Sequence, residues 1–167
     1  MIPRYTREEI GRVWSDANKF ASWLDVELAA TETLAEAGQV PKDAAAAIRA
    51  RAKIDVARIN ELEARVKHDV IAFTMAVGES IADPAAARWL HYGMTSNDVV
   101  DTAQALLIRD ASRLIEAALA ETRGRISGPD GAARRLGVPR TTLEYKIKSL
   151  RINKYRFRVK ARELVAP

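Results

Sequence analysis

The segment His91–Arg123, HYGMTSNDVVDTAQALLIRDASRLIEAALAETR, has the pattern of a polar loop followed by one long helix. Gly93 loosens the backbone, and the four residues from Thr95 to Asp98 are all good N-cap types, so a helix is predicted to begin near Asn97. Apolar residues then recur three and four positions apart, at Val100, Ala103, Leu107, Ala111, Leu114 and Ala118, and the face is widened by Val99, Leu106, Ile108 and Ile115. A helix with so wide an apolar face is predicted to be buried in a bundle.

The beginning of this helix also has the chemistry of an anion site. The free N–H groups and the positive dipole end of a helix N-terminus suit a carboxylate or a phosphate, and Thr95 and Ser96 place two hydroxyls beside it. The alternative is that Thr95 or Ser96 only caps the helix, which is a routine role for such residues. The residues alone favour capping.

Length and composition exclude several classes of protein. With 167 residues, the chain can form one ordinary domain or two small ones without disulfides or metals. It contains no cysteine, which excludes a disulfide scaffold, a thiolate zinc site and a cysteine nucleophile. No apolar run is long enough to span a bilayer, and MIPRYTREEI lacks the apolar centre of a signal peptide. We therefore expect a soluble, cytoplasmic protein with no membrane partner.

The net charge of +5 is unevenly distributed along the chain. Residues 1–120 carry 14 Lys and Arg against 18 Asp and Glu, a net of −4, whereas residues 121–167 carry 13 against four, a net of +9. Positive charge gathered in one segment indicates a polyanion partner, most simply nucleic acid. A solvated basic tail is the alternative, and charge alone does not decide between them.

Periodicity and capping residues predict helices before the segment His91–Arg123. Thr6 and Glu9 form a capping box for a first helical turn, and Ser15 caps a longer helix that Gly38 stops. Four further helices are predicted over residues 41–52, 55–66 and 70–82 and in a short segment from residue 84. No stretch alternates like a strand, so the predicted fold class is all-α.

The chain has two histidines that could carry chemistry. Lys67, His68 and Asp69 place a base, an imidazole and a carboxylate side by side, which can bind an anion and move a proton. His91 is the other histidine. An isolated histidine is more often structural or exposed than catalytic, and two histidines without a third ligand do not make a zinc site. We therefore expect no metal, and a redox enzyme is disfavoured.

Four segments of the first two thirds of the chain match a known pattern: MIPRYTREEI, VWSDANKFASWLDVELAA, VKHDVIAFTMAVGES and HYGMTSNDVVDTA. Together they strongly resemble the N-terminal segment of the bacterial adenylosuccinate lyases, in the fumarase/aspartase superfamily, over about residues 1–115. That family cleaves adenylosuccinate to AMP and fumarate by β-elimination in purine biosynthesis, without a metal or organic cofactor. The resemblance implies a lyase-like helical domain ending in the start of a long bundle helix.

The resemblance also implies substrate-binding and catalytic roles for individual residues. Arg4 and Tyr5 match residues that help to hold the nucleotide phosphate, where a guanidinium and a phenol are suitable donors. Lys67, His68 and Asp69 match the first active-site histidine motif of the family. The family usually has arginine before this histidine, and Lys67 lacks the bidentate fork of arginine, which puts that contact in doubt.

The remaining matches belong to the segment around His91. This residue matches a second active-site histidine, and Thr95 and Ser96 match contacts to the succinyl or fumarate carboxylates. Neither the family's later Thr-His motif, which supplies the general acid, nor its serine-rich loop with Met-Pro-x-Lys, which supplies the base, occurs here. Family sites also combine segments from three subunits. We therefore expect the isolated chain to have no meaningful lyase activity.

From about Glu121 the chain has the pattern of a helix-turn-helix. Ala133 is small where two helices cross closely, Gly137 permits a left-handed turn, and Pro139 leads into a second helix. In that helix Leu143, Ile147 and Leu150 face inward. The residues predicted to face the major groove lie at its start and on its outer face: Arg140, Thr141, Thr142, Tyr145 and Lys146. Lys148 is also predicted to bind DNA, by adding affinity for phosphate together with Arg151, Lys154, Arg156 and Arg158.

The segment GRISGPDGAARRLGVPRTTLEYKIKSLRINKYRF resembles the Fis-type helix-turn-helix that ends many NtrC-type bacterial transcription activators. A helical hairpin with a basic surface is the alternative. LIEAALAETR fits the helix that precedes this pair in the family, so the long helix is predicted to continue into the DNA-binding unit. The predicted domains are residues 1–115 and 116–167.

These observations lead to three hypotheses. The leading one is a catalytically incomplete lyase-like domain fused to a DNA-binding module with a regulatory role, with DNA as partner and AMP or adenylosuccinate as candidate ligands. Helix-turn-helix modules usually act as dimers, so the lyase-like half is a candidate for pairing two chains as a homo-oligomer. The second is a lyase fragment that is active only with complementing lyase chains. The third is a relic, a misjoined reading frame or a constructed chimera without an evolved function.

Overall fold

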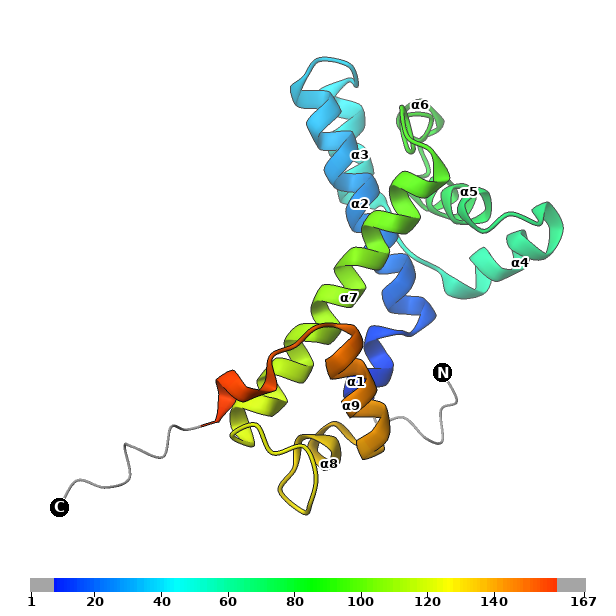
Figure 1. Cartoon of the computed structure of the whole chain (residues 1–167). Coiled ribbons are helices and arrows are strands. Elements are labelled where there is room, and N and C mark those ends of the chain that lie inside the picture. Colours follow the sequence, from blue (N-terminus) through cyan, green and yellow to red (C-terminus); the bar gives the residue numbers. More distant parts are fainter. Residues whose placement is uncertain (1–7, 159–167) are drawn as a thin grey trace. The chain divides into compact units, whose positions relative to one another are not determined.

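The computed structural model describes residues 8–158, and within this range it contains helices and no strand, which confirms the all-α prediction (Figure 1). The α-helices are α1 (Glu8–Val13), α2 (Asp16–Glu36), α3 (Lys42–Arg51), α4 (Val56–Val66), α5 (Asp69–Ile81), α6 (Pro84–Ala87), α7 (Ser96–Glu121), α8 (Ala132–Leu136) and α9 (Arg140–Ser149), followed by the 3-10 helix η2 (Lys154–Phe157). None of these helices is both long and apolar enough to cross a membrane.

The helices begin where the capping residues predicted. The Ser15 side chain accepts a hydrogen bond from the Asn18 backbone N–H at 3.2 Å, and the Asp55 carboxylate accepts one from the Arg58 N–H at 3.0 Å. Asp83 caps α6 in the same way, with Pro84 in the first turn. Each cap satisfies backbone donors that have no partner inside the helix. Thr6, the predicted cap of the first helical turn, lies outside the described residues.

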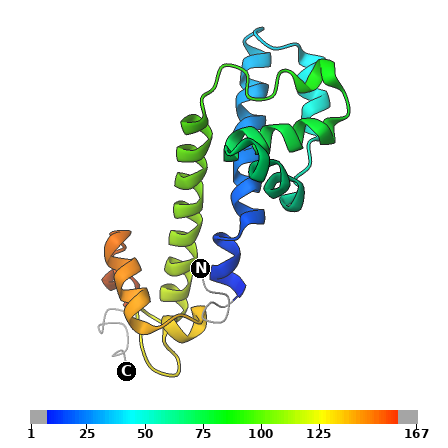
Figure 2. The same cartoon turned by 90° about the vertical axis from the view of Figure 1, so that its right-hand side faces the viewer.

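The chain divides into two compact units. We call residues 15–107 the N-terminal unit, and residues 1–14 with 108–167 the C-terminal unit. Helix α7 belongs to both, because its residues up to Leu107 are part of the first unit and those from Ile108 are part of the second. Figure 2 shows α7 running from Ser96 to Glu121 as one uninterrupted helix, as the sequence predicted.

An aromatic cluster forms the centre of the N-terminal core. The ring centroids of Phe20 and Trp23 on α2 are 5.4 Å apart, and Phe73 on α5 lies 5.4 Å from Trp23 and 6.0 Å from Phe20. Further apolar side chains from every helix of the unit surround this cluster, including Ile48, Ile59, Leu62, Val77, Ile81, Leu90 and Val99. Fully burying one such large side chain contributes about 1.5–3 kcal/mol.

A second, separate core holds the C-terminal unit together. It joins the last turns of α7 to α8 and α9 through Ile115, Ala118, Leu119, Ala132, Ala133, Leu136, Leu143 and Ile147, with Ile126 and Ile152 from the loops. Between α8 and α9, Gly137 has a φ of +62°, and the Val138 N–H donates to the Ala133 carbonyl at 3.0 Å. This is the left-handed helix ending that the glycine predicted. The end of α7 thus serves as the first of three helices.

Candidate functional site

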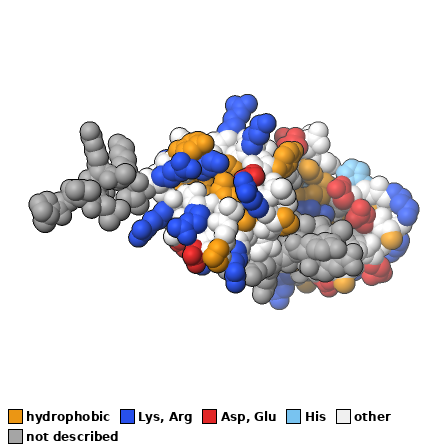
Figure 3. Space-filling model, turned by 60° about the horizontal axis from the view of Figure 1, so that its bottom comes forward, with side chains coloured by type: hydrophobic (Ala, Val, Ile, Leu, Met, Phe, Trp, Pro, Cys, Tyr) orange, Lys and Arg blue, Asp and Glu red, His pale blue; other side chains and the backbone are white. Residues whose placement is uncertain are grey.

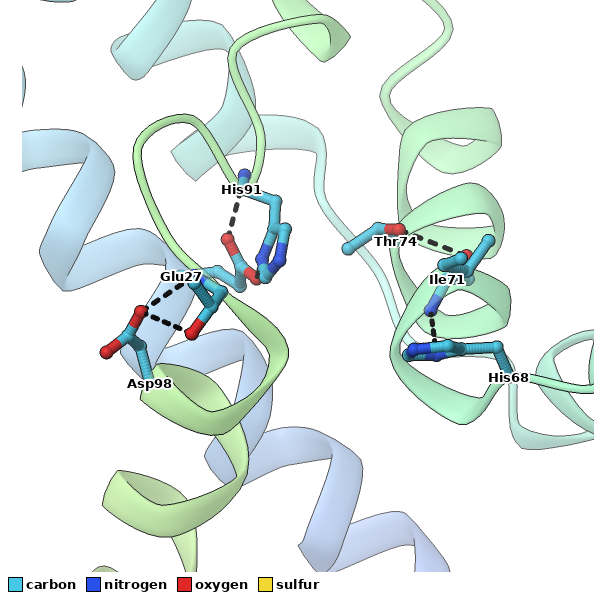
Figure 4. A network of polar contacts seen from close by, with 7 residues as sticks. Glu27, His68, Ile71, Thr74, His91 and Asp98 are labelled. Carbon is cyan, nitrogen blue, oxygen red and sulfur yellow. Dashed lines mark hydrogen bonds and ion pairs between the residues drawn. The ribbon is translucent and has the colours of Figure 1, made fainter.

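Glu27 and His91 form a polar pair at the edge of the N-terminal core. Glu27 is on α2 with none of its side chain exposed, whereas His91 is in the turn after α6 with 24% exposed. His91 Nδ1 lies 2.6 Å from Glu27 Oε1, and the His91 backbone N–H donates to Oε2 at 2.9 Å (Figure 4). Burial raises the pKa of the Glu27 carboxyl, against the opposing hydrogen bonds and charge of His91. One carboxylate therefore fixes both the ring and the backbone of His91, whose φ is +63°.

Thr95 and Asp98 cap the start of α7. The backbone N–H and the hydroxyl of Thr95 both donate to Asp98 Oδ2, at 2.7 and 2.9 Å. These bonds, the backbone one foremost, hold the pKa of the Asp98 carboxyl below its ordinary value. Ser96 follows as the first residue of α7. A ligand carboxylate would have to displace Asp98 to receive the Thr95 hydroxyl proton, so the carboxylate contacts of Thr95 and Ser96 stay a prediction.

Lys67, His68 and Asp69 lie at the junction of α4 and α5. Lys67 ends α4 with a left-handed φ of +57°, and His68 is the N-cap of α5, with Nδ1 accepting from the Ile71 N–H at 3.4 Å. Asp69 Oδ1 accepts from the Val70 N–H at 2.8 Å and lies 3.6 Å from His68 Nδ1. The His68 ring is thus exposed on one side and oriented by its own helix on the other.

The predicted lyase-type residues belong to two groups in the N-terminal unit (Figure 4). His91 pairs with Glu27, whereas His68 contacts the first turn of α5, and within residues 8–158 no hydrogen bond or ion pair joins the two histidines. Arg4 and Tyr5, the predicted phosphate contacts, lie outside the described residues. Within residues 8–158, no cluster of three or more acidic or histidine side chains could hold a metal ion.

Helix α9 presents part of the predicted DNA-binding set to solvent. Thr141 and Lys148 are exposed, and Tyr145 is 72% exposed although it is a large aromatic residue. Positions 141, 145 and 148 are spaced by four and three residues, so their side chains share one side of the helix. The opposite side carries Leu143 and Ile147, which are buried.

The other three predicted residues of α9 are placed differently. Arg140 is exposed, but its Nε lies 2.9 Å from Glu144 Oε1 one turn later. Thr142 is half-buried. Lys146 is also half-buried, and its Nζ lies 5.8 Å from the centre of the Trp14 ring at the end of α1. Such a position allows a cation–π attraction, which would compete with the predicted contact to DNA.

The basic residues of the C-terminal unit outnumber the acidic ones that could neutralise them. Glu116, Glu121, Asp130 and Glu144 each already pair with an arginine. Among the ion pairs of the described residues, none includes Lys148, Arg151 or Lys154. Figure 3, which brings this end of the chain forward, shows Lys and Arg side chains crowding the surface around scattered hydrophobic ones.

Two residues that matter at these sites were missed by the sequence reasoning. Glu27 follows Trp23 and Leu24 by four and three residues, so helical spacing already placed a carboxylate on the apolar side of α2. That is a usable signal, because a buried carboxylate needs a partner. Trp14, the partner of Lys146, gave no such signal, because the two are far apart in the sequence.

Two protein-family models match the chain. The model described as "Lyase" matches residues 4–126, and the model described as "Bacterial regulatory protein, Fis family" matches residues 112–150. The two matches overlap over residues 112–126, which include the last turns of α7. The overlap agrees with the continuity of that helix.

Curated relatives match the lyase part of the chain. Adenylosuccinate lyase of Streptococcus mutans is 46% identical over 115 residues, which are 69% of this chain and 26% of that protein. Adenylosuccinate lyase of Staphylococcus saprophyticus is 44% identical over 116 residues, 70% of this chain and 26% of that protein. The chain therefore spans about a quarter of the length of these relatives.

Solved structures match a similar share of this chain. The β-carboxy-cis,cis-muconate cycloisomerase of Acinetobacter calcoaceticus superposes with a TM-score of 0.65 at 26% identity, over 71% of this chain and 29% of the other. A fumarate lyase of a Mesorhizobium species gives a TM-score of 0.61 at 24% identity, which shows the fold alone. From these matches and the helices described above, the chain belongs to the lyase family of the fumarase/aspartase superfamily and carries a Fis-type helix-turn-helix at its C-terminal end.

Proposed function

We propose that the chain binds double-stranded DNA through α8 and α9 and that this binding has a regulatory role. The observation that carries the proposal is the division of α9 into two sides: Leu143 and Ile147 are buried in a three-helix core, while Thr141, Tyr145 and Lys148 face solvent. A recognition helix in the major groove needs this arrangement, with its inner side fixed by a core and its outer side free for base edges.

Charge supports the same proposal. Residues 121–167 carry a net charge of +9, and the acidic side chains at positions 116, 121, 130 and 144 are engaged by arginines. The cations that remain can replace the counterions of the DNA backbone, so binding should weaken steeply as salt rises.

Fluorescence anisotropy of a labelled duplex, selected by the wild type from a random-sequence pool and titrated at two salt concentrations, tests the proposal. The variant Thr141→Ala/Tyr145→Ala removes two side chains of the outer side of α9 and should lower affinity by about tenfold, which corresponds to a typical base contact. Lys42→Ala/Lys53→Ala, with two exposed lysines of the N-terminal unit, is the control and should bind like the wild type. A folded wild-type sample that binds no duplex at low salt would exclude this function.

A second candidate function is that of a lyase fragment completed by other chains. It is supported by His91, which Glu27 holds on both its ring and its backbone, and by the exposed ring of His68. A lyase chain that carries the missing acid and base segments can be inactivated by removing its own histidine at the position that matches His68. Mixing it with this chain should then restore release of fumarate from adenylosuccinate. The His68→Ala variant should fail to restore it.

Nucleotide binding can be tested without any turnover. If part of an ancestral pocket persists, AMP should raise the melting temperature of the wild type, because a ligand that binds only the folded state stabilises it. Arg4→Ala and His68→Ala should abolish the shift. Absence of any shift at millimolar AMP would count against a nucleotide site in this chain.

A further inference from the structure

The end of α9 places an arginine in a conformation that favours glycine. Arg151 has a φ of +53°, its N–H donates to the Lys148 carbonyl at 3.1 Å, and the next N–H, of Ile152, donates to the Ile147 carbonyl at 2.9 Å. This is a left-handed helix ending, where a Cβ is disfavoured and glycine is the usual residue. The backbone geometry alone therefore does not account for an arginine at this position.

Arg151 is one of the residues that line a cavity of about 350 Å³. Its lining includes three buried apolar residues, Ile126, Ile147 and Ile152. Lys148, Arg151 and Lys154 contribute three cationic residues to its wall. Glu144 also lines the cavity, but its carboxylate is held by Arg140 at 2.9 Å. The cavity is therefore a concave surface with a local excess of positive charge.

The wall formed by residues 152–155 is fixed to the rest of the unit. Asn153 Oδ1 accepts from the Tyr155 N–H at 3.1 Å and starts η2. Just beyond it, Arg156 Nη2 lies 2.5 Å from Glu116 Oε1 on α7. A Cβ added to Gly124 would lie only 3.0 Å from the Lys154 carbonyl, so this segment packs tightly against the end of α7. Lys154 is thus carried by a segment that is held against α7, and Lys148 by α9.

The cavity adjoins the exposed side of α9. Lys148 belongs to both, because it follows Tyr145 by three residues on the outer side of the helix and also lines the cavity. When a recognition helix lies in the major groove, backbone phosphates border the groove next to it. Arg151 follows Lys148, the last residue of the outer side of α9, by three residues, so the cavity is well placed for such a phosphate.

We propose that the cavity lined by Lys148, Arg151 and Lys154 binds a backbone phosphate of DNA, and that Arg151 occupies its left-handed position for this contact. The proposal rests on the DNA binding proposed above. It adds an anchor that carries no sequence information but fixes the register of α9 on the duplex.

A matched pair of variants tests it. Arg151→Gly removes one cation and places glycine at a backbone position with left-handed φ, where a side chain is disfavoured. Arg123→Gly does the same outside the cavity, because Arg123 is exposed in the C-terminal unit with a φ of +51°. Both variants should remain folded, with similar rises of Tm of about 2–4 °C. Only Arg151→Gly should lower DNA affinity, by about threefold to tenfold at low salt, and reduce the slope of log K against log salt by about 0.9.

Three results would overturn the proposal, and they have different meanings. If the wild type binds duplex and Thr141→Ala/Tyr145→Ala weakens it, but Arg151→Gly binds no worse than Arg123→Gly, the cavity has no role and the proposed function stands. If no folded sample binds duplex, the proposed function itself fails. If inorganic phosphate at constant ionic strength raises the Tm of the wild type but not of Arg151→Gly, while both bind DNA equally, the cavity takes a small free anion instead.

Discussion

Among single residues, Glu27 is one whose carboxyl makes the stability of the N-terminal unit depend on pH. Its pKa in the folded state lies above the ordinary value of 4.5, because burial outweighs the contacts with His91. Stability linked to a raised pKa is fully present below pH 4.5 and is lost as pH rises through the folded-state pKa. We predict that Glu27→Gln, which keeps an acceptor for the His91 N–H, gains stability relative to the wild type as pH rises above about 4.5.

Urea denaturation at several pH values between 4 and 8 measures this difference, and Glu32→Gln is a control of opposite sign. Hydrogen bonds from Arg49 hold the pKa of the Glu32 carboxyl below its ordinary value. The stability that Glu32 contributes is therefore present above pH 4.5 and is lost as pH falls. Glu32→Gln should accordingly be less stable than the wild type near neutral pH. A pH-independent effect of Glu27→Gln would contradict the assignment of Glu27.

The side chains of α9 could be predicted from the sequence only in part. The exposure of Thr141 and Tyr145 and the burial of Leu143 follow from helical spacing alone, and the structure has them as predicted. The position of Lys146 Nζ over the Trp14 ring could not be predicted, because that contact depends on packing between segments far apart in the chain. The roles of His68 and His91 remain predictions for a different reason: chemistry requires a ligand or partner group that spacing cannot supply.

At the scale of elements, the loop from α7 to α8 is held by backbone contacts that leave no room for a side chain. The N–H groups of Ala132 and Ala133 donate to the carbonyls of Arg125 and Ile126 at 2.9 and 3.0 Å. These bonds satisfy donors in the first turn of α8 that no side chain caps. They require the loop to fold closely over Gly131.

We predict that Gly131→Ala destabilises the C-terminal unit. A Cβ at Gly131 would lie 2.6 Å from the Ile126 carbonyl oxygen and from backbone atoms of Ser127, which cannot move without breaking the loop contacts. Such overpacking costs about 1–3 kcal/mol. Gly78→Ala is the control, since a Cβ there would meet only Ala87 Cβ at 4.0 Å and a helical glycine to alanine change stabilises by about 0.5–1 kcal/mol. Equal stability of the two variants in urea denaturation would contradict this account of the loop.

Helix boundaries could be predicted closely from the sequence because the signals are local. Ser15, Asp55 and Asp83 each cap a helix through a side chain that reaches only two or three residues ahead. Gly38 and Gly137 end helices through their own backbone freedom. The division of the chain within α7 is different, because no glycine or proline marks the change from one core to the other. The domain limits at residues 115 and 116 therefore stay a prediction.

At the scale of the whole molecule, the chain joins a lyase-family segment of net charge near −4 to a basic end of +9 through one helix. This distribution suits a protein whose basic end meets a polyanion while the rest is repelled from it. Effective use of a helix-turn-helix commonly needs two copies of it. A surface that pairs two chains would therefore support the proposed DNA binding.

We predict that the chain self-associates at micromolar concentration and that Ile108 on α7 takes part in the contact. Ile108 is 39% exposed although the apolar face of this helix is otherwise mostly covered, and the long helices of bundles bury this face against other helices, for which a second chain is the source tested here. Ile108→Glu should shift the chain toward monomer in sedimentation velocity and weaken DNA binding in parallel, because two linked modules bind more tightly than one. Ala117→Glu is the control: it is exposed on the same helix, but nine residues, or two and a half turns, place it on the opposite side. If both variants sediment like the wild type, Ile108 does not lie in a contact between chains, and another surface must pair the DNA-binding modules.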